Sequence, residues 1–180
     1  DKRRSKSASP ILSSTPPMIP HQLFLDGRYI GVDGTPKTRL INPATAEVFA
    51  EIDAATVKEV DAAAVSAHQA FESGWRDLAP GKRASVLFKI AAVIRENAEE
   101  LARLEVLHIG KPLADARDEV ALGARVFEYY AGGISRFYGQ TIPVARGGLD
   151  FTLRQPLGVV SAIVPWNFPF AIACWKVAPA

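Results

Sequence analysis

Residues 159–169 have the sequence VVSAIVPWNFP, and this stretch decides the fold class. Its first six residues, Val159–Val164, are nearly all apolar, a pattern typical of a central parallel strand that is buried on both faces. A turn follows in Pro165–Pro169, and the residues from Phe170 onward are expected to form a helix. Ligands of open α/β sheets sit at the carboxyl ends of the strands. The sequence therefore predicts an α/β fold with a ligand site near residues 164–168.

A helix-rich region precedes this stretch. Thr56-x-x-Glu59 is a capping box, in which each side chain satisfies a backbone N–H of the other residue, and Gly74 is expected to end the helix that it begins. The other helices are predicted to begin at Pro80, at about Asn97 and after Lys111-Pro112, and the last one runs to about Tyr138. Short strands are predicted at Leu23–Leu25, Tyr29-Ile30, Leu40-Ile41, Val48–Ile52, Thr141–Val144 and Leu149–Arg154.

The composition limits the classes of function. The chain has 180 residues and is 48% hydrophobic, which is enough for a globular domain. No apolar run is long enough for a bilayer, so no membrane partner is expected. The net charge of +2 arises from basic residues within the first six positions, which argues against a nucleic-acid surface. A single cysteine excludes a disulfide framework and a multi-cysteine metal site, and it favours a reducing compartment, the cytoplasm.

Both ends of the sequence have unusual patterns. Residues 1–17 are rich in serine, proline and positive charge but have no apolar core, so we expect a disordered or non-native tail and no secretory signal. An organellar transit peptide is the alternative, although no amphipathic period supports it. Met18, the only methionine, stands where ordered patterning begins. The final VAPA lies in a segment with a helical pattern and no stop signal, so we expect a truncated chain.

Five motifs, in this order along the chain, resemble the aldehyde dehydrogenase superfamily. They are Asn42-Pro43-Ala44-Thr45, Gly110-Lys111-Pro112, Glu128-Tyr129-Tyr130-Ala131-Gly132, Pro156-Leu157-Gly158-Val159-Val160, and the turn at residues 165–169 with Trp175-Lys176 after it. The resemblance extends from Leu23 to Ala180 and is greatest to betaine-aldehyde-type and related broad-substrate enzymes. It implies the N-terminal part of an enzyme that oxidises an aldehyde to a carboxylic acid with NAD or NADP.

The resemblance also implies the domain organisation. Residues 18–138 would form the N-terminal part of the cofactor-binding domain, and residues 139–156 an oligomerisation hairpin. Residues 157–180 would form the first strand, turn and helix of a Rossmann-like sheet, and the catalytic domain would be missing. The thiohemiacetal would form on a cysteine beyond residue 180, where the general-base glutamate also lies. A homodimer or homotetramer is the implied assembly.

Asn167 is the catalytic residue that the resemblance assigns to the oxyanion hole. A neutral side-chain amide donates a hydrogen bond without requiring a counter-charge, which suits this role. The alternative for Asn167 is an ordinary helix N-cap. The resemblance further assigns cofactor contacts to Ile163, Val164, Pro165, Trp166 and Asn167. It places Phe168, Ile172 and Trp175 along the aldehyde tunnel, with ordinary helix core as their alternative.

Three other residues are notable. Lys176 lies in an apolar stretch, so we expect it to be buried, where a lysine must pair or lose its proton. The resemblance gives it a catalytic charge relay, and a structural ion pair is the alternative. Cys174 lies within the helical pattern and is expected to be a small core residue, not the nucleophile. His108 stands where the family commonly has an acidic ligand of a monovalent cation, so that cation site is in doubt and no metal is predicted.

Two other functions remain open from the sequence. A CoA-acylating or semialdehyde dehydrogenase has the same fold and would differ mainly in residues outside this chain. A catalytically inactive structural homologue, or a non-functional fragment, belongs to a different class. The resemblance implies a small-molecule aldehyde as the substrate.

Overall fold

Two β-hairpins begin the part of the chain, residues 20–180, that the computed structural model describes. Strands β1 (Leu23–Leu25) and β2 (Arg28–Ile30) are antiparallel. The residues between them, Asp26 and Gly27, both have positive φ, 52° and 74°, as a tight two-residue hairpin turn requires. Strands β3 (Thr38–Ile41) and β4 (Val48–Ile52) form the second hairpin. These predictions are confirmed, whereas the predicted tail at residues 1–17 lies outside the described residues.

Helix α1 (Val57–Ala70) begins at the predicted capping box. The Thr56 hydroxyl accepts the Lys58 N–H at 3.2 Å, and the Glu59 carboxylate accepts the Thr56 N–H at 3.0 Å. The helix continues into a π-helical turn, η1 (Phe71–Trp75), in which Gly74 has a φ of 158°. No residue of α1 is buried, and its valines are exposed to solvent. The core of the described chain therefore lies elsewhere.

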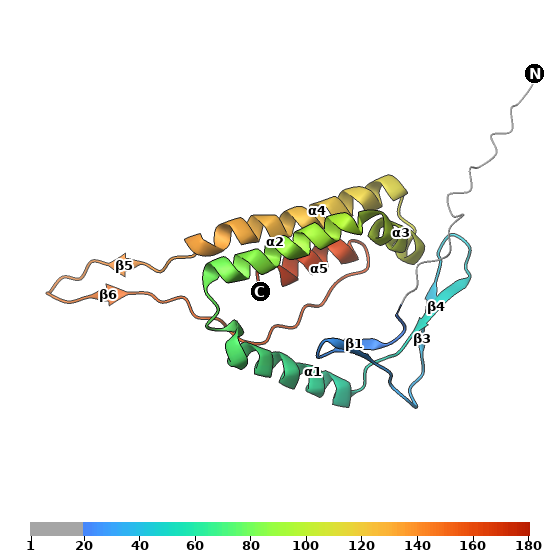
Figure 1. Cartoon of the computed structure of the whole chain (residues 1–180), viewed down its shortest axis with the longest axis horizontal. Helices are drawn as coiled ribbons and strands as arrows, with labels where there is room; N and C mark the ends of the chain where they lie inside the picture. Colours follow the sequence, from blue (N-terminus) through green and yellow to red (C-terminus); the bar gives the residue numbers. More distant parts are fainter. Residues whose placement is uncertain (1–19) are drawn as a thin grey trace, which may run out of the picture.

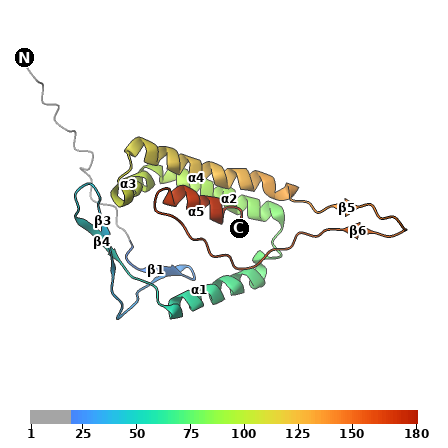
Figure 2. The same cartoon turned by 180° about the vertical axis from the view of Figure 1, so that it is seen from behind.

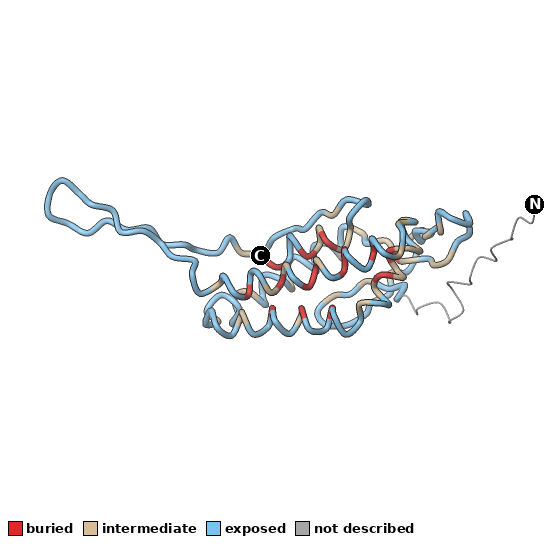
Figure 3. Tube along the Cα trace, turned by 90° about the horizontal axis from the view of Figure 1, so that it is seen from above, coloured by how far each residue is buried: buried red, intermediate tan, exposed pale blue. Residues whose placement is uncertain are grey.

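The core lies between four helices, which Figures 1 and 2 show packed together. They are α2 (Pro80–Glu96), α3 (Ala98–Ile109), α4 (Leu113–Gly133), which continues into the 3₁₀ turn η2 (Ile134–Arg136), and α5 (Pro169–Val177). Figure 3 shows the buried positions concentrated along these helices. The cluster consists of Leu87, Ala91, Ile94, Ala102, Ala116, Val120, Ala124, Phe127, Ala131, Cys174 and Ala178. Its many alanines allow the helices to approach closely.

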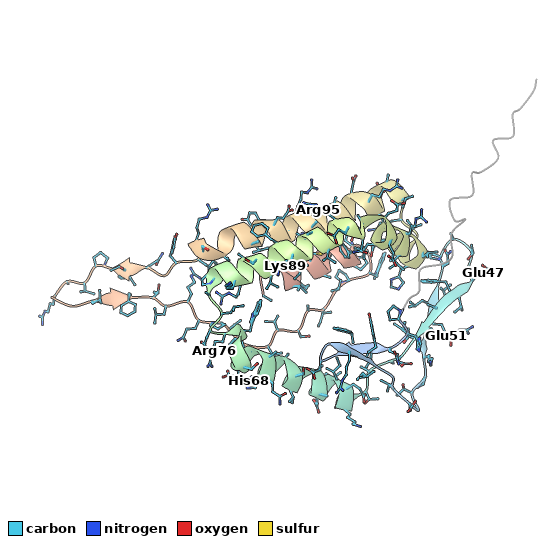
Figure 4. All side chains as sticks on the ribbon, viewed as in Figure 1. Glu47, Glu51, His68, Arg76, Lys89 and Arg95 are labelled. Carbon is cyan, nitrogen blue, oxygen red and sulfur yellow. The ribbon has the colours of Figure 1, made fainter. Side chains whose placement is uncertain are left out.

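Ion pairs join the helices at the rim of this core. Arg95 of α2, labelled in Figure 4, lies 2.6 Å from the Glu128 carboxylate of α4. Arg117 of α4 lies 2.8 Å from the Glu99 carboxylate of α3. Both pairs are exposed to solvent and contribute little to stability compared with the apolar core.

A third hairpin, β5 (Thr141–Ile142) and β6 (Asp150–Phe151), projects away from the helices. It forms at the predicted position, but each strand has only two residues. Along the hairpin every residue is exposed, and Leu149 and Leu153 are 77% and 72% accessible. An isolated hairpin without a covered face has little stability of its own, which explains the short strands.

The predicted central strand, Val159–Val164, does not form in this structure. These residues have no regular secondary structure and lie in the long connection from β6 to α5 (Figure 1). Ile163 is 80% exposed. A central parallel strand needs neighbouring strands on both sides, and all sheets in residues 20–180 are two-stranded local hairpins. The chain is a mixture of helix and strand, but the parallel sheet is absent from the described part.

Candidate functional site

The turn at residues 165–168 lies directly before α5, at the end of the helix bundle near α3 and α4 (Figure 1). Asn167 is exposed. The N-cap of α5 is Phe168, and the Phe168 side chain makes no hydrogen bond to the first turn of the helix. The N-cap alternative for Asn167 is therefore not supported, and its amide is accessible.

The residues predicted to contact the cofactor form one exposed strip. Ile163 and Trp166 are 80% and 81% accessible, Pro165 is also exposed, and Val164 is half-buried. Exposed apolar side chains that are contiguous can mark a ligand-binding or protein-interaction surface, whereas isolated ones are ordinary. No G-x-G-x-x-G phosphate loop occurs in the chain. The strip is therefore an apolar surface that is open to a ligand or to another part of the protein.

The residues predicted to line the aldehyde tunnel lie on or next to α5. Phe168 and Trp175 are 50% and 51% accessible, and Ile172 is half-buried. The Phe168 ring has a specific partner, because the Lys111 Nζ atom lies 4.4 Å from its centroid. The two aromatic side chains do not form helix core in the described part of the chain.

The expectation that Lys176 is buried is wrong for this structure. Helix α5 packs one face on the bundle through Ala171 and Cys174, whereas Lys176 is on the exposed side. Within residues 20–180 Lys176 forms no ion pair, so the structural alternative is not formed there. An apolar stretch on a short helix was misleading, because only one of its faces is covered.

Cys174 is buried, as predicted, at the contact between α4 and α5. A Cβ atom added to Gly123 of α4 would lie 2.9 Å from the Cys174 Sγ atom and 2.6 Å from the Phe170 ring. The glycine thus permits the close approach of the two helices. Burial raises the pKa of the Cys174 thiol to about 11. Both observations support a packing role for this cysteine and not a nucleophilic one.

Sequence reasoning missed a buried charged cluster beside the turn. Glu119 of α4 is 3% exposed, and its Oε1 atom accepts the backbone N–H of Ala171 at 3.0 Å. Its Oε2 atom contacts the ammonium group of Lys111, which also lies 3.6 Å from a Glu105 carboxylate oxygen. One sequence signal was available: Glu119 lies three residues after Ala116 and four before Gly123, on the apolar face of α4.

His108 and His68 both lie at the surface of the protein. His108 is exposed, and its ring makes an edge-to-face contact with Phe49 of β4, with centroids 6.2 Å apart. His68, labelled in Figure 4, lies exposed on α1.

No group of three or more histidine, cysteine or acidic side chains suited to a metal occurs in residues 20–180. Over the same residues, no helix is both long and apolar enough to cross a membrane.

Comparisons with known proteins agree on one family. The sequence model of the aldehyde dehydrogenase family matches residues 31–180. An aldehyde dehydrogenase of Aspergillus niger is 38% identical over 163 residues, which are 89% of this chain and 32% of that protein. A solved mutant of the aldehyde dehydrogenase from Bacillus cereus has a TM-score of 0.83 and 38% identity, over 88% of this chain and 33% of that one.

A second solved relative, a mutant of the P. syringae indole-3-acetaldehyde dehydrogenase AldA, was determined in complex with NAD+ and IAA. It has a TM-score of 0.84 and 36% identity, over 89% of this chain and 33% of that chain. The present chain spans about a third of the length of the curated relatives that it matches.

Proposed function

The chain belongs to the aldehyde dehydrogenase family, and we propose that it forms the N-terminal part of an NAD(P)-dependent enzyme that oxidises an aldehyde to a carboxylic acid. The observation that carries this proposal is the exposed turn before α5. It presents the Asn167 amide and an apolar strip, in a chain whose fold matches solved members of the family. One of those relatives was solved with NAD+.

The proposed roles follow the chemistry of aldehyde oxidation. A cysteine thiolate beyond residue 180 would add to the aldehyde and give a thiohemiacetal with a negatively charged oxygen. The Asn167 amide N–H would donate to that oxygen. A preorganised donor of this kind stabilises charge that develops only in the transition state. Bound NAD(P)+ supplies the hydride acceptor, and water, activated by a glutamate also beyond residue 180, would release the acid.

The exposed strip is the proposed cofactor edge. Ile163, Val164, Pro165 and Trp166 would cover one side of the dinucleotide, with Asn167 at the reacting end. Phe168, Ile172 and Trp175 would line the path of the aldehyde. Lys176 is exposed and therefore accessible to a carboxylate from outside the described residues, as a charge relay would require.

We propose the domain organisation given by the sequence. Residues 18–138 would be the N-terminal part of the cofactor-binding domain, residues 139–156 the oligomerisation hairpin, and residues 157–180 the start of the Rossmann-like sheet. In that assembly the Val159–Val164 segment would become a strand once neighbouring strands pair with it. We propose a reducing, cytoplasmic location, since the single cysteine serves packing.

The function is tested by assaying the full-length protein with a panel of aldehydes and NAD+ or NADP+. We expect NAD(P)H formation with the carboxylic acid as product and no requirement for CoA. The 180-residue chain alone should show no turnover. An absolute requirement for CoA would replace our proposal with an acylating dehydrogenase, and a full-length protein without turnover would indicate an inactive homologue.

The third hairpin predicts self-association. Its exposed strand edges and the apolar side chains of Leu149 and Leu153 form a template for pairing with a second copy. Light scattering on the 180-residue chain should therefore show oligomers or aggregates at high concentration. Leu153→Lys places a charge on the edge and should reduce this association. A clean, stable monomer of the unchanged chain at high concentration would contradict this prediction.

A further inference from the structure

Helix α5 begins without a cap of its own. Its N-cap, Phe168, makes no side-chain hydrogen bond to the first turn, so the N–H groups there need acceptors from elsewhere. One of them, the Ala171 N–H, is buried and donates to the Glu119 Oε1 atom at 3.0 Å. Glu119 belongs to α4, 52 residues earlier in the chain. A carboxylate at a helix N-terminus is also favoured by the helix dipole.

Lys111 links the same carboxylate to the turn. Its ammonium group contacts the other oxygen of Glu119, and its Nζ atom lies 4.4 Å from the centroid of the Phe168 ring. Lys111 is itself largely buried, with a side chain that is 11% exposed. Phe168 immediately follows Asn167. The Lys111–Glu119 pair therefore holds the residues on the C-terminal side of Asn167 at two points, a ring and a backbone N–H.

The Lys111–Glu119 ion pair is buried, so water does not screen its charges. The Glu119 side chain is 1% exposed, so its charge is compensated by Lys111 and by the Ala171 N–H and not by bulk water. Glu105 is the third member of the cluster, 3.6 Å from Lys111. Burial raises the pKa of Glu105, although the nearby Lys111 acts in the opposite direction. Of the two carboxylates, Glu119 has the closer contact with the Lys111 ammonium group.

We propose that Glu119 is a positioning residue for the oxyanion amide of Asn167, acting through the Ala171 N–H and, with Lys111, through Phe168. This proposal rests on the proposed dehydrogenase function. Glu119 touches neither substrate nor cofactor in this role. It fixes the first turn of α5, and the amide that precedes that turn is thereby held in one orientation. Small displacements of an aligned group are costly in turnover.

The first arm of the test does not depend on activity. Hydrogen exchange of the peptide that contains the Ala171 amide is measured by mass spectrometry in the full-length protein. Glu119→Ala should speed this exchange at least about tenfold, since a hydrogen bond to a charged group is lost. Exchange of the peptide that contains the Val120 and Ala124 amides of α4 should change little. Glu128→Ala is the matched control, because Glu128 is on the same helix but its side chain is 39% exposed and pairs with Arg95 at the rim.

The second arm measures kcat and KM of the full-length enzyme in a double-mutant cycle. Glu119→Ala should lower kcat about 10- to 100-fold with little change in the KM for NAD(P)+. In an Asn167→Ala background the same change should have almost no further effect, because Glu119 acts through Asn167. Glu119→Gln keeps an acceptor for the Ala171 N–H and should recover part of the loss.

Each outcome decides the proposal. An equal loss of kcat in both backgrounds would show that Glu119 has only a general structural role and would overturn it. Unchanged exchange at Ala171 would overturn it as well. If Glu119→Ala does not fold, the neutral pair Lys111→Met with Glu119→Gln is used in the same cycle. A full-length parent without dehydrogenase activity would refute the proposed function instead, while the exchange arm would still decide whether Glu119 fixes α5.

Discussion

Asn167→Ala in the full-length enzyme is expected to lower kcat about 10²- to 10³-fold, the usual cost of losing one oxyanion donor. The lost hydrogen bond forms mainly in the transition state, so the KM for the aldehyde should change little. Stability should also change little. Asn167 is exposed and the N-cap of α5 is Phe168, so the substitution removes no cap. Steady-state kinetics and thermal melting on the same variant measure both effects.

The matched control is Asn97→Ala. Asn97 is also an exposed asparagine, but its amide donates to the Val93 carbonyl at 2.8 Å, between α2 and α3. We expect this variant to lose stability, by about 0.5–1.5 kcal/mol, and to retain normal turnover. The opposite pattern for Asn167→Ala, with a free energy of unfolding lower by about 1 kcal/mol and near-normal kcat, would restore the N-cap interpretation and remove the assigned oxyanion donor.

Alkylation of Cys174 by iodoacetamide should be at least about 100-fold slower in the folded chain than in the unfolded chain at neutral pH. Burial raises the thiol pKa to about 11 from an ordinary value of 9.0, and only the thiolate reacts. Because this pKa is raised, the thiolate is scarce throughout the neutral range. The rate in the folded chain should keep increasing about tenfold per pH unit through pH 9, where an ordinary thiol begins to level off.

Unfolded chain in denaturant is the control for this measurement, because it exposes the same thiol. Cys174→Ser should leave the turnover of the full-length enzyme essentially intact, apart from a loss of stability caused by a buried hydroxyl. Rapid alkylation of the folded chain, together with loss of all turnover in Cys174→Ser, would contradict the packing role and make Cys174 a candidate nucleophile.

Local features of the fold were predictable from the sequence. The Asp26-Gly27 hairpin, the capping box at Thr56 and the end of α3 at Gly110, which has a φ of 74°, each depend on neighbouring residues only. The Val159–Val164 segment is different. Its apolar pattern predicts a strand, but a parallel strand forms only with partners that are distant in the sequence, and residues 20–180 supply none.

The residues of the candidate site also divide into those that a local motif predicts and those that depend on contacts distant in the sequence. Asn167 and the apolar strip before it were found from a contiguous motif. The Glu119 contact was not, because it joins two residues 52 positions apart and no local pattern specifies that pairing. The expected burial of Lys176 failed for a related reason. Hydropathy along a helix does not say which of its faces another element will cover, and α5 is covered on one face only.

The central claim is that residues 159–168 form the cofactor edge of an aldehyde dehydrogenase. A crystal structure of the full-length protein with NAD(P)+ bound tests it most directly. We expect Val159–Val164 to pair as a strand on both sides, with Pro165 and Trp166 against the dinucleotide and the Asn167 amide directed at the reacting end. A segment that remains an exposed loop while the dinucleotide binds elsewhere would contradict the claim.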